Sequence, residues 1–345
     1  MMFQFSQLAA PIIQAPMAGG VCTPELVAAV ANAGGLGSFG FAYSQANTIS
    51  QEILAAKSLS KGPINANFFV FQKPNLPSQD HQSQALQALQ ELPLAANFAF
   101  ETPQAPYYLD LDQQLAPVWQ NPPEVLSFHF GIPNSFIIEK AHSLGISVGI
   151  TATNCQEALA IEKAGADFIV AQGIEAGGHR GSFDANALPQ GSTTLELVQQ
   201  LRKHIHLPIV AAGGLMNGQA IQQVLRAGVV AAQLGTAFLC CHEAGTHPSY
   251  KAFLLANKHR SCVFTQAFSG RFAKGVQNEF ITLMHQKPVL PFPIQNSVTS
   301  ALRQWASKTQ NPEYQSIWAG DGFAQLKQTS VASLMDELVA EMTIA

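Results

Sequence analysis

Short apolar runs recur along the chain, and the stretches between them space their apolar residues as amphipathic helices do. A short run without a polar face is typical of a parallel strand that is covered on both sides. Eight such runs predict strands at residues 12–17, 36–42, 64–70, 125–130, 147–151, 168–172, 208–212 and 230–235. The pattern therefore predicts a strand–helix unit that repeats along the chain.

Residues that cap helices mark where several of the predicted helices begin. A Thr or Asn side chain at this place accepts a hydrogen bond from the first turn of the helix. The candidate N-caps are Thr23, Asn134, Asn154 and Asn217. Pro24 takes the first helical position after Thr23, where proline is favoured, and Glu157 after Asn154 predicts a capping box. Further helices are expected at residues 49–59, 81–92, 194–204 and 331–342.

The alternation of strands and helices sets the expected fold class. Eight strands in this order favour an α/β fold of the closed (β/α)8 TIM-barrel class over an open doubly wound sheet. After residue 245 the alternation ends. We expect residues 1–245 and 326–345 to form the barrel. We expect residues 246–325 to form a small, mainly helical subdomain, inserted between strand eight and its closing helix, that covers the active site.

One glycine motif is excluded as a nucleotide site. Residues 35–40 match Gly-x-Gly-x-x-Gly, but a dinucleotide-binding motif follows a strand, opens a helix and has an acidic residue about 20 positions later. Here a helix precedes the glycines, a strand contains them, and Lys57 and Lys61 stand where the acid is needed. These glycines are therefore expected to serve turns and close packing.

The composition of the chain indicates which kinds of molecule it can bind. Hydrophobic residues make up 47% of the 345 residues and charged residues 12%, about half the usual charged share of roughly 25%, so much of the chain should be buried. A net charge of −4 without a basic run predicts no nucleic acid partner. No apolar run reaches the ~20 residues of a membrane span. Five cysteines without Cys-x-x-Cys spacing indicate reduced thiols in a cytoplasmic protein. The expected partner is a small molecule.

The ends of the predicted strands carry the candidate binding groups. In a (β/α)8 barrel the active site lies at the C-terminal ends of the strands, and the loops after strands seven and eight often bind phosphate. These two loops contain Gly213-Gly214 and Gly235-Thr236, whose backbone N–H groups and hydroxyl suit a phosphate monoester. With the amides of Asn67 and Gln172, the set fits flavin mononucleotide (FMN), and no metal is required.

Two histidines lie at strand ends and are predicted to face one pocket. His129 ends strand four, and His179 follows strand six within the glycine-rich stretch of residues 175–181. Histidine is the side chain whose ordinary pKa lies near neutrality. We expect both side chains to belong to an active site, with His129 placed to bind substrate.

Taken together, these stretches resemble the nitronate monooxygenases, in particular their bacterial class I. The resemblance covers nearly the whole chain and is carried by residues 11–20, 129–133, 172, 175–181, 212–214, 233–236, 269–271 and 318–320. The Gly-Gly-His-Arg-Gly block is specific to this class. The Ala-Gly-Gly-Leu and Leu-Gly-Thr blocks are shared with flavin-dependent enoyl-acyl-carrier-protein reductases and quinone reductases. Asp321 departs from the pattern of this family, in which Gln is the commoner residue at this position.

The resemblance implies an FMN enzyme that oxidises alkyl nitronates, such as propionate 3-nitronate, with O₂ to a carbonyl product and nitrite. It makes His179 the catalytic histidine. His179 would act as a base on a neutral nitroalkane, or would only hold the anion of a preformed nitronate. The predicted flavin site consists of Pro16, Met17, Ala18, Asn67, Gln172, Gly177, Gly178, Gly213, Gly214, Gln233, Leu234, Gly235 and Thr236.

Two other functions remain open at the level of the sequence. One is an NAD(P)H-dependent flavin reductase that acts on quinones or enoyl thioesters. The other is a flavin-binding barrel that has lost catalysis and serves as a binding or regulatory protein. The oligomeric state is not predicted by any feature of the sequence.

Overall fold

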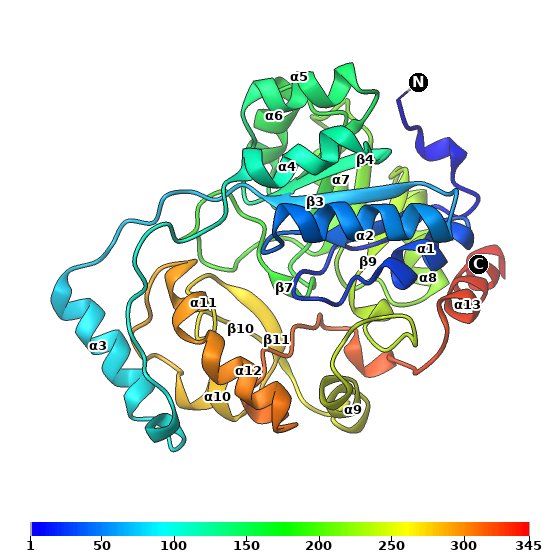
Figure 1. Cartoon of the computed structure of the whole chain (residues 1–345). Coiled ribbons are helices and arrows are strands. Elements are labelled where there is room, and N and C mark those ends of the chain that lie inside the picture. Colours follow the sequence, from blue (N-terminus) through cyan, green and yellow to red (C-terminus); the bar gives the residue numbers. More distant parts are fainter. Residues whose placement is uncertain (1, 345) are drawn as a thin grey trace.

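Eight parallel strands form a barrel at the centre of the structure, a computed structural model that describes residues 2–344 (Figure 1). Their hydrogen-bonded order is β1-β9-β8-β6-β5-β4-β3-β2. A parallel bridge between Ile13 and Leu36 joins the two ends of this order. The strands are β1 Ile12–Gln14, β2 Gly37–Gly40, β3 Ile64–Phe69, β4 Val125–His129, β5 Ser147–Ala152, β6 Phe168–Gln172, β8 Ile209–Ala212 and β9 Ala231–Leu234. The predicted barrel is confirmed.

The helices that connect the barrel strands pack around the barrel, and several of them begin at the predicted N-cap residues. The helices are α1 Pro24–Asn32, α2 Ala46–Leu59, α3 Gln79–Gln90, α4 Leu111–Gln120, α5 Ser135–Ser143, α6 Cys155–Lys163, α7 Thr194–Leu201, α8 Gly218–Arg226, α9 Pro248–Ala256, α10 Glu279–Leu283, α11 Ile294–Val298, α12 Ser300–Lys308 and α13 Val331–Ile344. All four predicted N-cap side chains accept a hydrogen bond from their helix. The prediction of a capping box at Asn154 is wrong. The Glu157 carboxylate accepts hydrogen bonds from the main-chain N–H and the hydroxyl of Thr153 instead of the main-chain N–H of Asn154. No helix within residues 2–344 is long and apolar enough to cross a membrane.

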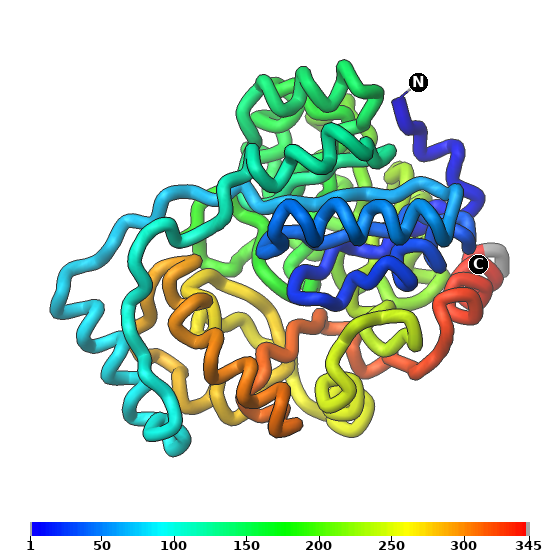
Figure 2. The backbone as a smooth tube through the Cα atoms, viewed as in Figure 1, coloured from blue at the N-terminus to red at the C-terminus, as the bar shows by residue number. Residues whose placement is uncertain are grey.

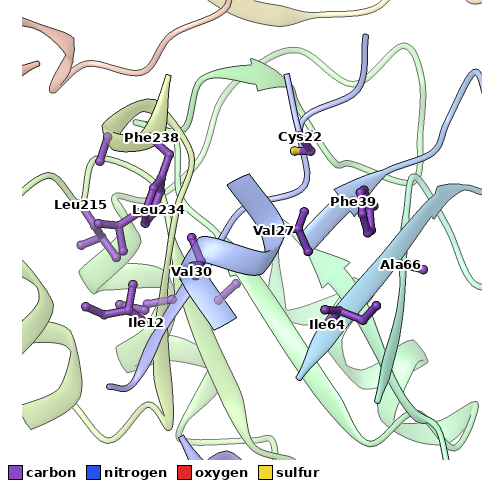
Figure 3. Packing of buried hydrophobic residues seen from close by; sticks show 14 of the residues in the cluster. Ile12, Cys22, Val27, Val30, Phe39, Ile64, Ala66, Leu215, Leu234 and Phe238 are labelled. Atoms are coloured by element: carbon purple, nitrogen blue, oxygen red, sulfur yellow. The ribbon is translucent and has the colours of Figure 1, made fainter. Parts of the chain in front are cut away.

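The largest apolar cluster lies between the strands and the helices. In Figure 3, Val27 and Val30 of α1 lie among side chains of the strands, including Ile12 of β1 and Phe39 of β2. Strands β3, β5 and β6 are buried at every residue, and this includes their polar residues Asn65, Asn67 and Thr151. The barrel is therefore a rigid support for the groups at its rim.

A second unit lies against the C-terminal end of the barrel. Strands β10 Cys262–Thr265 and β11 Ala273–Val276 form an antiparallel sheet with β7 Gly178–His179, which belongs to the loop after β6. The expected insertion between the last barrel strand and its closing helix is present, since α13 packs against α1 and α8. The subdomain is mainly helical, but its two strands were not predicted.

Helix α3 joins this second unit although it lies in the connection between β3 and β4. Figures 1 and 2 show it beside α10 and α12, away from the barrel. Leu89 and Phe100 share an apolar cluster with Phe268 and Phe280. The second unit is therefore built from two separate parts of the sequence.

Candidate active site

His179 lies at the junction of the barrel and the second unit. The loop that leaves β6 at Gln172 ends in β7, where His179 pairs with Ala273 of β11 and Gly178 pairs with Lys274. This short antiparallel pairing fixes the backbone of the loop over the ends of the barrel strands. The histidine is thereby held by both parts of the molecule.

Three side chains bind His179 directly. Its Nε2 atom lies 2.9 Å from the hydroxyl oxygen of Ser269. Its main-chain oxygen accepts hydrogen bonds from Nε2 of Gln172 at 3.0 Å and from Nε2 of His129 at 3.3 Å. The structure thus brings the two predicted histidines together, but His129 contacts the backbone of His179.

Aromatic rings surround the half-buried imidazole. The rings within 6.2 Å of its centroid belong to Phe69, Phe130, Phe292 and Trp318. Phe71 stacks on Phe292 and forms one wall of a cavity of about 280 Å³. An apolar surround of this kind limits the contact of the imidazole with water and strengthens the electrostatic forces that act on it.

Both histidines are held in the uncharged form. Burial, and next the guanidinium of Arg271, lower the pKa of His179 to about 3, with smaller effects from His129 and Arg303. Burial and Arg271 also lower the pKa of His129 to about 3. A neutral imidazole has one nitrogen that donates and one that accepts, so His179 can receive a proton at one atom.

Arg271 is the main positive charge beside the two histidines. Its guanidinium carbon lies 3.8 Å from the centre of the Phe130 ring, and one of its terminal nitrogens donates to the main-chain oxygen of Ser182. The side chain is 4% exposed, and its Nε has no hydrogen-bond partner in the described chain. Arg271 makes no salt bridge within residues 2–344, and the more distant Glu157 and Asp184 offset only part of the effect of burial. A buried cation of this kind is costly, which suits a site that receives an anion.

The loop of residues 173–181 is held by two polar side chains, Arg180 within it and Gln172 just before it. Arg180 donates to the main-chain oxygens of Gln172, Gly173 and Thr153 at 2.5, 2.9 and 3.3 Å. The side-chain oxygen of Gln172 accepts from Gly181 N at 2.8 Å. Gln172, predicted to contact the flavin, therefore also shapes the loop.

The two glycine loops offer unpaired main-chain donors at the rim. The N–H groups of Gly213, Gly214, Gly235 and Thr236 donate to no atom of residues 2–344. Gly214 has a φ of +68°, and a Cβ there would come within 3.0 Å of the Glu175 side chain. Free N–H groups on such loops suit the oxygens of a phosphate. The residues present fit a phosphate monoester.

The remaining predicted cofactor residues border the same end of the barrel. The Met17 sulfur lies 3.8 Å from where a Cβ on Gly235 would stand, so the loop of Pro16 to Ala18 adjoins the end of β9 at Gln233 and Leu234. The Asn67 side chain donates to the Ser127 hydroxyl at 2.9 Å. Gly177 has a different constraint, because a Cβ there would come within 2.5 Å of Gly320 N.

Segment 318–321 closes the site from the side of the second unit. The Thr236 hydroxyl accepts from Gly320 N at 3.0 Å. The Asp321 carboxylate, where the resemblance favours Gln, pairs with buried Lys274 at 2.7 Å. Asp321 thus links this segment to β11, the strand that also pairs with His179.

The sequence predictions did not include Ser269 or Arg271 as site residues. Both belong to the Ser-Gly-Arg stretch that marked the resemblance. A Ser-Gly-Arg turn that carries a charge inside an otherwise apolar region was the available signal. Within residues 2–344 no three His, Cys, Asp or Glu side chains are grouped so that they could hold a metal ion.

Comparison with known proteins gives one consistent result. A family model described as nitronate monooxygenase matches residues 2–341. The chain is 39% identical over 342 residues to a nitronate monooxygenase of Paraburkholderia phytofirmans, covering 96% of this chain and 92% of the relative. It is 38% identical over 340 residues to one of Pseudomonas aeruginosa, covering 96% of each.

Solved structures agree with the sequence relatives. The nitroalkane oxidase from Streptomyces ansochromogenes matches with a TM-score of 0.92 and 35% identity over 98% of this chain and 97% of that one. FabK from Thermotoga maritima matches with a TM-score of 0.76 at 22% identity, over 99% and 94% of the two chains. At this low identity, the similarity to FabK supports the fold and no statement about function.

Proposed function

The chain belongs to the nitronate monooxygenase family, and we propose that it uses FMN and O₂ to convert alkyl nitronates of the propionate 3-nitronate type to a carbonyl product and nitrite. Membership of the family makes the chain an oxidoreductase that acts on nitronates. The observation that carries the finer proposal is the neutral His179 imidazole, enclosed by aromatic rings, beside the Arg271 cation.

The proposal of FMN is supported by the donors at the rim. The free N–H groups of Gly213, Gly214, Gly235 and Thr236 would hold the phosphate. The amides of Asn67 and Gln172, with the loops that contain Met17 and Gly178, would contact the ring. When bound, the flavin would supply a two-electron acceptor that O₂ can reoxidise.

The protein residues would bind the substrate and handle its proton. Arg271 provides a positive field that favours an anionic nitronate. With a neutral nitroalkane, His179 would first take the α-proton as a general base. The nitronate formed in this way would stabilise the imidazolium, because an adjacent negative charge favours the charged form of histidine.

A nitrite assay tests the proposal. Purified protein loaded with FMN should release nitrite from propionate 3-nitronate in air, and flavin-loaded protein that releases none would refute the proposal. The variant His179→Asn should keep the flavin and lose most of the turnover. A flavin reductase would instead be bleached rapidly by NADH without oxygen, an outcome that would favour the alternative function.

We also propose a cytoplasmic location. It is supported by the five cysteines, all of which are free thiols in the structure. Reduced thiols are typical of proteins in reducing compartments. Fractionation of the cells that produce the protein would test this proposal.

A further inference from the structure

The hydroxyl group of Ser269 has three polar contacts at once. Its oxygen lies 2.9 Å from Nε2 of His179, 3.1 Å from the main-chain oxygen of Arg271 and 3.4 Å from the main-chain nitrogen of Arg271. Ser269 is 1% exposed, so bulk water does not reach the hydroxyl. Each contact must therefore be assigned from the donors and acceptors that are present.

The proton count decides the direction of these hydrogen bonds. A hydroxyl has one hydrogen to donate, and a main-chain oxygen can only accept. Within the described chain, the Ser269 hydroxyl is the one donor to the buried oxygen of Arg271. If Ser269 donates there, its oxygen must accept from His179, which places the imidazole proton on Nε2.

The other imidazole nitrogen is then the acceptor. The Nδ1 atom of His179 bonds no atom of residues 2–344, and the residue is partly exposed. In the neutral ring, this nitrogen carries the lone pair when Nε2 carries the proton. The loop itself cannot shift easily, since His129 and Gln172 both hold the main-chain oxygen of His179.

We propose that Ser269 is a positioning residue that fixes His179 as the Nε2–H tautomer and leaves Nδ1 as the atom that accepts a proton from substrate. The part that concerns substrate rests on the proposed function. With a neutral nitroalkane, the α-carbon–hydrogen bond breaks, its electron pair forms the C=N bond of the nitronate, and the proton moves to Nδ1. A preformed nitronate needs no such transfer.

Nitrogen NMR of the flavin-loaded protein tests the tautomer directly. In protein with ¹⁵N-labelled histidine near pH 7, the pair of signals absent from His179→Asn belongs to His179. We expect Nε2 to show the shift of a protonated nitrogen and Nδ1 that of an unprotonated one. The opposite assignment in the wild-type protein would overturn the proposal, and this result needs no variant of Ser269.

Two variants then test the role of the hydroxyl. Ser269→Ala should weaken the Nε2–H signal or shift the proton to Nδ1, whereas Ser269→Thr should keep the wild-type tautomer. Ser269→Ala should also lower kcat on a neutral nitroalkane about 10- to 100-fold, with less than about a threefold change on the preformed nitronate.

The outcomes separate this proposal from the proposed function. An unchanged tautomer in folded Ser269→Ala, or an equal loss on both substrates, would show that Ser269 is only structural and would overturn the proposal. If wild-type protein oxidises no nitronate at all, the proposed function fails. The NMR result still confirms or refutes the tautomer in that case.

Discussion

The Nε2 atom of His129 lies 3.3 Å from the main-chain oxygen of His179, so one histidine of the site holds the backbone of the other. Because a carbonyl oxygen only accepts, His129 donates and its own proton lies on Nε2. Gln172 donates to the same oxygen. The geometry assigns His129 a contact with the loop, whereas the sequence predicted a contact with substrate.

Substitution of His129 separates these two roles. His129→Ala removes one donor to the His179 oxygen, and we expect kcat to fall about tenfold because the imidazole loses its fixed position. KM should change little, since the substrate loses no direct contact. The exposed His204→Ala should keep wild-type kinetics. Steady-state assays with propionate 3-nitronate would distinguish the two roles, and a raised KM with unchanged kcat would support the predicted role in substrate binding.

The barrel was predictable because its strands are short, apolar and separated by capped helices. Strand β6 and the N-cap of α8 at Asn217 were located from local sequence alone. Helix α4 was missed, since it contains Pro117 and lies in a polar, proline-rich stretch. The pairing of β7 with β11 was also missed, because a two-residue strand has no periodicity to detect.

Only the site residues that lie at the ends of barrel strands could be predicted from the sequence. Barrel topology places the exits of β4, β6, β8 and β9 on one rim, and this brought His129, His179 and the glycine loops together. Ser269 reaches His179 across 90 positions of sequence. No local sequence pattern predicts a contact between residues so far apart in the chain. The packing of Gly177 against Gly320 could not be predicted for the same reason.

Gly214 tests the proposed phosphate loop. Gly214→Ala places a Cβ at a φ of +68° within 3.0 Å of Glu175, and we expect FMN to bind at least about tenfold more weakly as the loop shifts. Gly165→Ala is the matched control, because Gly165 has a φ of +85° after α6, far along the chain from both glycine loops. Both variants should lose about 1 kcal/mol of stability. Flavin titration by fluorescence would show the difference, and equal FMN affinity in the two variants would contradict the phosphate assignment.

Arg180 tests how the loop of residues 173–181 is held. Its guanidinium binds three main-chain oxygens, which the single ammonium of Arg180→Lys cannot all reach. We expect a loss of about 2 to 4 kcal/mol in the free energy of unfolding, because buried oxygens lose donors. Arg202→Lys, at an exposed arginine, should stay within about 0.5 kcal/mol. Urea unfolding measures both, and comparable losses would show that the three contacts stabilise little.

The lowered pKa values of His129 and His179 make stability depend on pH. In the folded protein both pKa values are about 3, while in the unfolded chain they are about 6.5. Below pH 6.5 the unfolded state therefore binds protons that the folded state does not, so stability is full above that pH and falls as the pH drops toward 3. Each histidine contributes at most about 1.4 kcal/mol per pH unit, and less where its ring is partly exposed.

Removal of one titrating ring should flatten this dependence. His179→Asn has one site histidine in place of two, so its free energy of unfolding should fall less than that of the wild type between pH 7 and pH 5. In this window most carboxylates of the unfolded chain remain ionised, which leaves histidines as the main source of the slope. His204→Asn removes an exposed histidine and retains both site histidines, so it should follow the wild type. Urea unfolding at equal flavin loading measures all three slopes, and a wild-type slope in His179→Asn would mean that His179 is protonated in the folded protein at pH 5.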